Sequence, residues 1–372
     1  MNTLKDIDIK GKKVLLRCDF NVPIKDGKVV DNSKIVASLK TINYLKDNGC
    51  KVIILSHLGR VKTEEDKYKN TLKPVAQELS NVLNEKVYFI DNCVGSTLAS
   101  EIDNAKGIVL LENTRITDIP DKKESTNDLE LAKFWSTLGD VYVNDAFASL
   151  HRAHSSTAGV AKYLDHAVGF LVEEELEKLN ILVNDTPHPF TVFMGGAKVD
   201  DKLPIIKSLL QRCDYLLVGG GIANSFLKAK GEDVGDSLVT EDENILKEVK
   251  SLLDEYQEKI VLPIDFVKDG NAICDVGQKT IEAYSNYFSK SQIIFVNGTC
   301  GIYEDSDFDD GTIMLFQALK ASGKKVIIGG GDTTAAIKKL GFENVFYHVS
   351  TGGGATLEYI ADKSLAALEW LK

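Results

Sequence analysis

Short apolar runs rich in valine and isoleucine alternate with amphipathic helical patterns along the whole chain. Such alternation is typical of α/β folds, in which helices join the strands of a parallel sheet. The sequence therefore predicts an α/β fold with parallel sheets. The predicted strands are Val14–Arg17, Val52–Leu55, Gly107–Leu111, Val141–Asn144, Phe190–Met194, Tyr215–Val218, Ile260–Ile264, Ile293–Val296, Val326–Ile328 and Val345–Tyr347.

The length of 372 residues is more than one ordinary hydrophobic core accommodates, so we expect two domains. The stretch Val172–Val183 has apolar residues at helical spacing among acids, which predicts one amphipathic helix. The loop after it contains two prolines and indicates a boundary. We expect an N-terminal domain over 1–170, an interdomain helix over 171–185 and a C-terminal domain over 186–355.

Composition excludes several classes of protein. The net charge of −11 argues against nucleic acid as a partner. No apolar run reaches the length of a transmembrane helix, and the first residues do not resemble a signal peptide, so we expect no membrane association. The six cysteines form no CxxC pair, which favours a reduced, cytoplasmic setting without a disulfide framework or a zinc site.

Arginine and histidine follow the predicted strands of the first half, at the point where each strand ends. Ligands of open α/β sheets bind outside the carboxyl ends of the strands, so we expect these cations to converge. Convergent arginines indicate a ligand with more than one anionic group. The alternative is a set of unrelated ion pairs with local acids. The polar residues that follow these strands are Arg17, Asp19, Asn21, His57, Arg60, Arg115, Asp145, His151, Arg152 and His154.

Glycine-rich turns follow most of the predicted strands of the second half. The first turn, Gly195-Gly196, precedes Lys198 and Lys202, which fall about one turn apart near the start of a helix predicted through Leu203 to Leu210. Backbone N–H groups, a helix N-terminus and paired ammonium groups suit phosphate. Tight packing of short turns is the alternative, and we expect it to explain only one or two of them. The other turns are Gly219–Gly221, Gly298 with Gly301, Gly329–Gly331 and Gly352–Gly354.

Asp332 directly follows one of these turns. A carboxylate beside bound phosphate requires a cation between them, and Mg²⁺ held by one carboxylate and phosphate oxygens suits that position. An N-terminal helix cap is an equally good interpretation of Asp332 from the local sequence. The chain has no GxxxxGK[ST] and no GxGxxG after a strand, so neither a P-loop nor a dinucleotide site is indicated.

Nine ordered motifs make the chain resemble phosphoglycerate kinases over nearly its whole length. These are Arg17–Pro23, Ser56–Arg60, Leu110–Arg115, Val143–Phe147, His151–Ser155, Gly195–Val199, Gly219–Asn224, Gly329–Thr333 and Ser350–Ala355. The resemblance implies two Rossmann-like domains with parallel sheets that face each other across a hinged cleft. It also implies that the tail, 356–372, returns to the N-terminal domain.

The resemblance implies reversible phosphoryl transfer between 1,3-bisphosphoglycerate and ADP, giving 3-phosphoglycerate and ATP, by a cytoplasmic monomer that uses Mg²⁺. It places Lys198, Lys34 and Arg152 in catalysis and Asp332 on the metal. It places the triose substrate on Arg17, Asp19, Asn21, His57, Arg60, Arg115 and Arg152. It places the nucleotide on Gly195, Lys198, Lys202, Gly219, Gly220, Asn297, Glu304, Gly331, Asp332 and Thr333.

One departure from the family's pattern bears on activity. The family has an arginine near the start of the first helix, where this chain has Lys34. Lysine keeps the charge but loses the planar fork of donors. A ligand-binding paralogue with little turnover is therefore the alternative to an active kinase. An NAD-dependent oxidoreductase of similar fold is a third expectation, which the missing GxGxxG disfavours.

Overall fold

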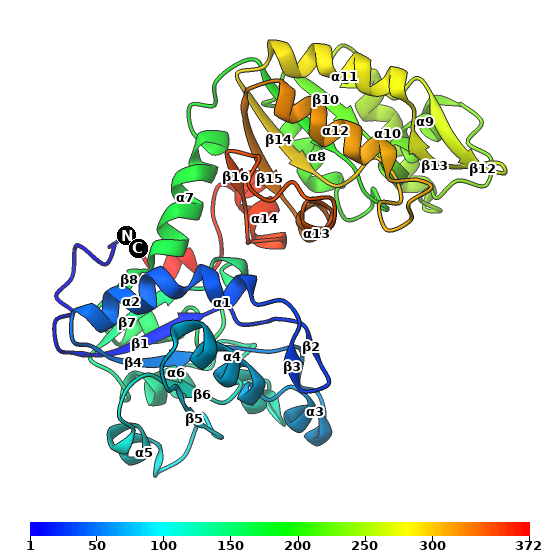
Figure 1. Ribbon diagram of the computed structural model, residues 1–372. Coiled ribbons are helices and arrows are strands. Elements are labelled where there is room, and N and C mark those ends of the chain that lie inside the picture. Colours follow the sequence, from blue (N-terminus) through cyan, green and yellow to red (C-terminus); the bar gives the residue numbers. More distant parts are fainter. The chain divides into compact units, whose positions relative to one another are not determined.

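The computed structural model describes every residue from Met1 to Lys372. The chain forms two compact units: a first unit of Met1–Leu176 with Ser364–Lys372, and a second unit of Glu177–Lys363. Helix α7, Phe170–Val183, begins in the first unit and ends in the second (Figure 1). Each unit contains a six-stranded sheet, and every strand pair in both sheets is parallel. The predicted fold class is confirmed.

The sheet of the first unit has the strand order β5-β6-β4-β1-β7-β8. The chain builds the sheet on one side of β1 and then crosses to β7 on the other side. Ligands of open α/β sheets bind where the strand order reverses in this way, here at the carboxyl ends of β1 and β7. The strands are β1 Lys13–Cys18, β4 Lys51–Leu55, β5 Tyr88–Ile90, β6 Val109–Leu111, β7 Val141–Asp145 and β8 His166–Val168.

Both faces of this sheet are covered. Alternate strand residues such as Leu16 and Ile54 join one core with Ile42 and Leu79 of the covering helices. The residues between them, such as Leu15, are also fully buried, as expected for a parallel sheet with helices on both sides. The helices of the first unit are α1 Ser33–Ala37, α2 Leu39–Asp47, α3 Glu64–Lys69, α4 Lys73–Leu83, α5 Leu98–Asn104 and α6 Leu129–Ser136, with a small hairpin of β2 Ile24–Lys25 and β3 Lys28–Val29.

The sheet of the second unit has the strand order β11-β10-β9-β14-β15-β16. Its order reverses between β9 and β14, so the carboxyl ends of those two strands are its expected ligand edge. The strands are β9 Phe190–Met194, β10 Tyr215–Val218, β11 Ile260–Val261, β14 Ile293–Asn297, β15 Lys325–Gly329 and β16 His348–Val349.

The helices of the second unit likewise cover both faces of its sheet. Tyr284, Phe316 and Ile337, from three helices, share one core with Val296 and Ile328 of the strands. These helices are α11 Gln278–Lys290, α12 Asp310–Ala321 and α13 Gly331–Lys339, and the others are α8 Leu203–Leu210, α9 Gly220–Lys230, α10 Glu243–Glu255 and α14 Gly354–Asp362 (Figure 1). A hairpin of β12 Phe266–Asp269 and β13 Ala272–Val276 precedes α11 and is not among the predicted strands.

Three predicted strands needed correction. The strand predicted over Ile260–Ile264 ends at Val261, because Pro263 cannot donate to a sheet hydrogen bond. The strand predicted over Gly107–Leu111 begins at Val109, since Gly107 has a φ of +128°. The prediction over Val345–Tyr347 was wrong: the strand is His348–Val349, because Phe342 and Phe346 both pack on the Phe316 ring and the chain turns between them.

The last residues, from Ser364 onwards, belong to the first unit, whereas Thr356–Lys363 belong to the second. The tail that returns therefore begins at Ser364 rather than at the expected Thr356. The amide of Ala367 donates to the carbonyl of Leu150 at 2.9 Å. None of the helices combines the length and the apolar character that crossing a membrane requires.

Candidate functional site

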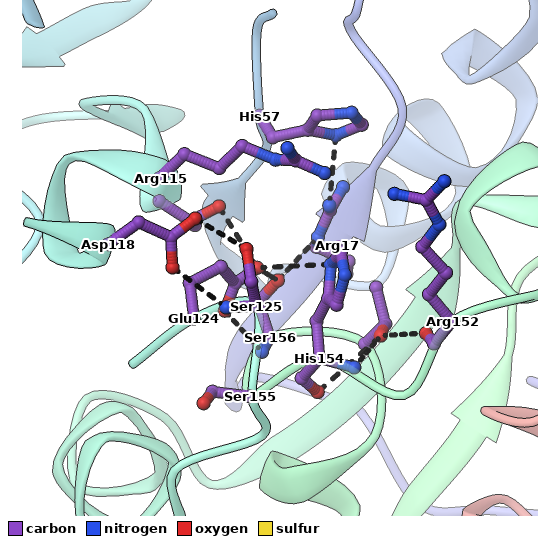
Figure 2. Close-up of polar contacts among 12 residues, drawn as sticks. Arg17, His57, Arg115, Asp118, Glu124, Ser125, Arg152, His154, Ser155 and Ser156 are labelled. Carbon is purple, nitrogen blue, oxygen red and sulfur yellow. Dashed lines mark hydrogen bonds and ion pairs between the residues drawn. The ribbon is translucent and has the colours of Figure 1, made fainter. Parts of the chain in front are cut away.

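Three arginines and two histidines gather at the ligand edge of the first sheet (Figure 2), and the arginines carry the positive charge. We call Arg17, His57, Arg115, Arg152 and His154 the cation cluster (Figure 2). They come from the end of β1, the loop after β4, the 3₁₀ turn Thr114–Asp118 after β6 and the loop after β7. Four strand ends thus supply one cluster, as the sequence predicted.

Arg17 lies at the base of the cluster and is 0% exposed. Its Nε donates to Ser156 Oγ at 2.8 Å, and its Nη2 lies 3.1 Å from His57 Nδ1. Its Nη1 donates to the carbonyl of Cys18. All of these partners belong to the protein, and solvent does not reach the guanidinium. Arg17 therefore acts on its surroundings through His57 and Ser156.

A buried acid that the sequence analysis missed balances this arginine. Glu124 is 0% exposed and accepts the Ser156 amide at 3.0 Å and the Thr114 hydroxyl at 3.2 Å. The Ser156 hydroxyl also donates to Glu124 (Figure 2). Burial raises the pKa of Glu124, and the charge of Arg17 opposes that rise. Glu124 lies in an irregular loop, and no sequence pattern marks it. The available indication was indirect: a buried arginine requires a counter-charge.

The field in the cluster is strongly positive. Burial and the charges of Arg115, Arg17 and Arg152 lower the pKa of His154 to about 3, although Glu124 lies 4.0 Å from its Nδ1. Burial also lowers the pKa of Arg115, whose Nε is buried without a partner. Such a field favours a bound anion and disfavours further protonation.

The remaining residues predicted for the triose substrate are Asp19, Asn21 and Arg60. Asp19 binds Lys34, with 2.9 Å between Nζ and Oδ2. Burial opposes ionisation of Asp19, but the charge of Lys34 and the hydrogen bonds from Lys34 and the Asn21 amide outweigh it, so the pKa of Asp19 is lowered. Asn21 Oδ1 accepts the amide of Gly59 at 2.9 Å. Arg60 is exposed, and no contact joins its guanidinium to the cation cluster.

Asp145 does not face the cluster, contrary to expectation. Its Oδ1 accepts the amides of Leu171 at 2.9 Å and Val172 at 3.3 Å, at the beginning of α7. A carboxylate at a helix N-terminus is favourably placed relative to the helix dipole. Asp145 therefore belongs to the attachment of α7 and not to the anion site.

Most glycines of the second unit's turns are required by packing, which corrects the expectation that packing explains only one or two turns. A Cβ on Gly195 would lie 2.2 Å from the Thr299 carbonyl oxygen, and one on Gly221 would lie 2.0 Å from that of Ala197. By contrast, Gly196 has open space beside it and a φ of +103°. An open position of this kind leaves room for a ligand against the backbone.

Buried side chains join the strand ends of the second sheet. Lys202 Nζ donates to Asn297 Oδ1, and Asn297 Nδ2 donates to the Gly329 carbonyl at 2.7 Å. Thr333 Oγ1 accepts the Gly298 amide at 2.6 Å. Burial lowers the pKa of Lys202, although the charges of Asp332 and Asp201 oppose this. Asn297 and Thr333 thus hold the turns together, and Lys198 is exposed in the loop before α8.

A cavity of about 220 Å³ lies beside these turns. Gly220, Glu304 and Asp332 line it, as do the apolar side chains of Leu238 and Ile302. The other residues predicted for the nucleotide are not part of its lining: Gly195, Lys198, Lys202, Gly219, Asn297, Gly331 and Thr333. Apolar walls with a few polar groups suit a base and its sugar.

Asp332 is the second residue of α13 and is exposed, while Gly330 takes the N-cap position. The interpretation of Asp332 as a helix cap is therefore wrong. No group of three or more histidines, cysteines, aspartates or glutamates gathers to hold a metal. The exposed carboxylate of Asp332 at the cavity fits an ion such as Mg²⁺, which takes its other ligands from phosphate and water.

Comparisons with known proteins identify the family. The family model described as phosphoglycerate kinase matches residues 4–363. The chain is 44% identical to the phosphoglycerate kinase of Enterococcus faecalis, over 98% of each chain. It is 43% identical to that of Lacticaseibacillus casei, over 98% of this chain and 97% of the other.

Solved structures give the same result. The phosphoglycerate kinase structure from Coxiella burnetii matches with a TM-score of 0.86 and 35% identity, covering 99% of this chain and 98% of the other. That from Pyrococcus horikoshii matches with a TM-score of 0.87 and 32% identity, covering 100% and 98%. The chain therefore belongs to the phosphoglycerate kinase family of glycolytic enzymes.

Proposed function

We propose that this chain catalyses reversible phosphoryl transfer between 1,3-bisphosphoglycerate and ADP, giving 3-phosphoglycerate and ATP. The first unit binds the triose and the second binds the nucleotide. The observation that carries this assignment is the convergence of Arg17, Arg115 and Arg152 from different strand ends of the first sheet (Figure 2). Burial and these arginines lower the pKa of His154 to about 3. A triose with a phosphate and a carboxylate or acyl phosphate supplies the matching negative charges.

In the first unit, Arg115 and Arg152 bind the anionic groups of the triose, with Arg60 contributing from the rim. His57, Asn21 and Asp19 orient the rest of the substrate. Arg17 supports them from below, since it is fully enclosed. Lys34 Nζ lies 2.9 Å from Asp19 Oδ2. Lys34 faces the phosphoryl group that is being transferred.

In the second unit, the cavity takes the base and ribose, with Glu304 binding the ribose hydroxyls. The turns at Gly195, Gly219, Gly220 and Gly331 surround the phosphates, and Asn297 and Thr333 fix those turns. Lys202 binds nucleotide phosphate, and Asp332 is the residue that would hold Mg²⁺. When bound, Mg²⁺ supplies neutralisation of the phosphate charge.

Phosphoryl transfer of this kind needs positioning and charge neutralisation more than covalent chemistry. The phosphoryl group that is being transferred receives positive charge from Lys198, Lys34 and Arg152. Direct transfer requires the two substrates to meet away from water, so we propose α7 as the hinge, because it begins in one unit and ends in the other. We further propose that the protein works as a monomer in the cytoplasm.

A second candidate is a binding protein of the same fold with little turnover. Lys34 favours it, because one arginine acting on a phosphoryl group contributes roughly 10³-fold or more in rate. Against it stands the retention of Lys198, Asp332 and the arginines of the cation cluster in one chain. No observation favours the oxidoreductase.

The assignment of substrates to units is tested by steady-state kinetics of two variants. Arg115→Ala loses a charged hydrogen bond to the triose, worth about 1.5–3 kcal/mol, so the KM for 3-phosphoglycerate rises about tenfold or more. Its KM for Mg-ATP stays within about twofold of the parent's. In Asp332→Asn the KM for Mg-ATP should rise, and the KM for 3-phosphoglycerate should stay near the parent's. A rise of the same KM in both variants would refute the assignment of substrates to units.

A further inference from the structure

We propose that Glu124, Ser156 and Arg17 form a hydrogen-bonded chain that positions His57 as a neutral N–H donor to the triose substrate. Figure 2 labels the four residues of this hydrogen-bonded chain. Glu124, Ser156 and Arg17 are its positioning residues, and His57 is the member that contacts the ligand. The inference rests on the proposed triose site of the first unit and adds to it the protonation state and the support of one of its residues.

The direction of the last hydrogen bond fixes the form of the imidazole. A guanidinium has donors and no acceptor. Because Arg17 Nη2 lies 3.1 Å from His57 Nδ1, Nδ1 must accept, and the ring proton must reside on Nε2. His57 is therefore neutral, with its single N–H on the nitrogen that does not face Arg17.

The preceding bonds are equally directional. Arg17 Nε donates to Ser156 Oγ at 2.8 Å, so the Ser156 hydroxyl is free to donate onward, and its acceptor is Glu124 Oε1. The Ser156 amide donates to Glu124 Oε2 at 3.0 Å, which fixes the carboxylate at both oxygens. The chain thus has one donor and one acceptor at every step, from the buried anion to the imidazole.

The surrounding charges keep His57 in this form. Burial lowers the pKa of His57 well below its ordinary value, and the charges of Arg17, Arg115 and Lys34 lower it further. The charge of Asp19 acts in the opposite direction without reversing the result. At neutral pH the His57 ring therefore stays neutral when the anionic substrate is absent. It does not have to lose a proton when the substrate binds.

The neighbouring serine provides a matched control. Ser155 and Ser156 are both 0% exposed. Ser155 Oγ lies within hydrogen-bond distance of two carbonyl oxygens, at 2.9 Å from that of Lys123 and 3.0 Å from that of Asp128. The Ser155 hydroxyl forms no hydrogen bond with Arg17 or with the Glu124 carboxylate. Removing either hydroxyl leaves buried groups without a hydrogen-bond partner, so both changes lower the stability of the fold. Only removal of the Ser156 hydroxyl breaks the hydrogen-bonded chain from Glu124 to His57.

The test compares Ser156→Ala and Ser155→Ala in the full-length enzyme. Substrate kinetics are combined with ¹⁵N NMR of the histidine ring nitrogens, in which His57 is assigned with a His57→Gln variant. We expect Ser156→Ala to raise the KM for 3-phosphoglycerate about tenfold, to leave the KM for Mg-ATP unchanged and to give mixed tautomers at His57. Ser155→Ala should leave both KM values and the tautomer as in the parent.

Ser156→Thr, which keeps the hydroxyl, should restore the parental KM and tautomer. If Ser156→Ala does not fold, Glu124→Gln is measured in the same way and should show the same loss. A single Nε2–H tautomer and an unchanged KM in the variant that breaks the chain would overturn the proposal. So would an equal rise of the KM in both serine variants. An unchanged triose KM in Arg115→Ala would instead refute the proposed substrate site.

Discussion

Single buried charged residues set much of the chemistry of this protein. In the first unit, Arg17 and Glu124 are both fully buried and balance each other through Ser156. In the second unit, Asp275 is 1% exposed and accepts the amides of Gly311 at 2.6 Å and Val276 at 2.8 Å. Asp275 also lines the proposed nucleotide cavity. Since it has no cationic partner among these contacts, its ionisation is costly.

Asp275 gives a pH-dependent prediction. Burial, with the charges of Asp310 and Asp309, raises the pKa of Asp275 from 3.8 to about 7. Between about pH 4 and pH 7, Asp275 is protonated in the folded state and ionised in the unfolded state. The free energy of unfolding that Asp275 contributes therefore falls progressively as the pH rises through this range. Asp275→Asn has no such dependence. Its free energy of unfolding relative to the parent should increase by about 4 kcal/mol from pH 4 to pH 8.

Urea unfolding followed by far-ultraviolet circular dichroism at several pH values measures this difference. The change with pH is the test, because the amide of the variant also alters the contact with Gly311 at every pH. Asp265→Asn is a suitable comparison, since hydrogen bonds from Thr280 and Lys279 overcome burial and lower the pKa of Asp265. A relative stability of Asp275→Asn that does not vary with pH would contradict the prediction.

At the scale of elements, strands with buried β-branched runs were predictable and short or interrupted ones were not. β9 and β10 have the predicted bounds, Phe190–Met194 and Tyr215–Val218. β5 and β8, of three residues each, were missed because such short runs have no periodicity. The strand ends could be predicted, and with them the cation cluster. Glu124 could not, because its place depends on how an irregular loop packs beneath Arg17.

The C-terminal segment is an element whose contribution can be measured separately. Leu365 and Leu371 are each 1% exposed and belong to the first unit. Both tryptophans of the chain, Trp135 and Trp370, also belong to that unit, so tryptophan fluorescence reports its unfolding. Leu365→Ala and Leu371→Ala should each destabilise the first unit by about 2–5 kcal/mol. The fluorescence transition should move to lower urea concentration.

The second unit has a separate core, so the circular dichroism change that belongs to it should stay at the parental urea concentration. Leu238→Ala, at a position that is 54% exposed, serves as the control and should leave both transitions in place. Fluorescence transitions of Leu365→Ala and Leu371→Ala that coincide with the parent's would show that the C-terminal segment does not stabilise the first unit.

At the scale of the whole molecule, the two units have the same sheet arrangement. Each unit has a six-stranded parallel sheet whose strand order reverses beside its first strand, β1 or β9. Candidate ligand groups gather at both reversals: the cation cluster in the first unit, and the glycine turns with Asp332 in the second. One site thus suits a multiply charged anion and the other a nucleotide. Kinase activity needs both sites in one chain, and Lys34 is the residue that puts it most in question.

The most direct test is Mg-ATP-dependent phosphorylation of 3-phosphoglycerate in a coupled assay, with the parent and Lys34→Arg measured side by side. We predict robust turnover by the parent, because Asp19 holds Lys34 in place and the remaining cations stay with it. Lys34→Arg should change the rate by less than about tenfold, well below the roughly 10³-fold effect of an essential arginine. A silent parent that Lys34→Arg restores would contradict this account and identify a binding protein that lost its chemistry at one residue.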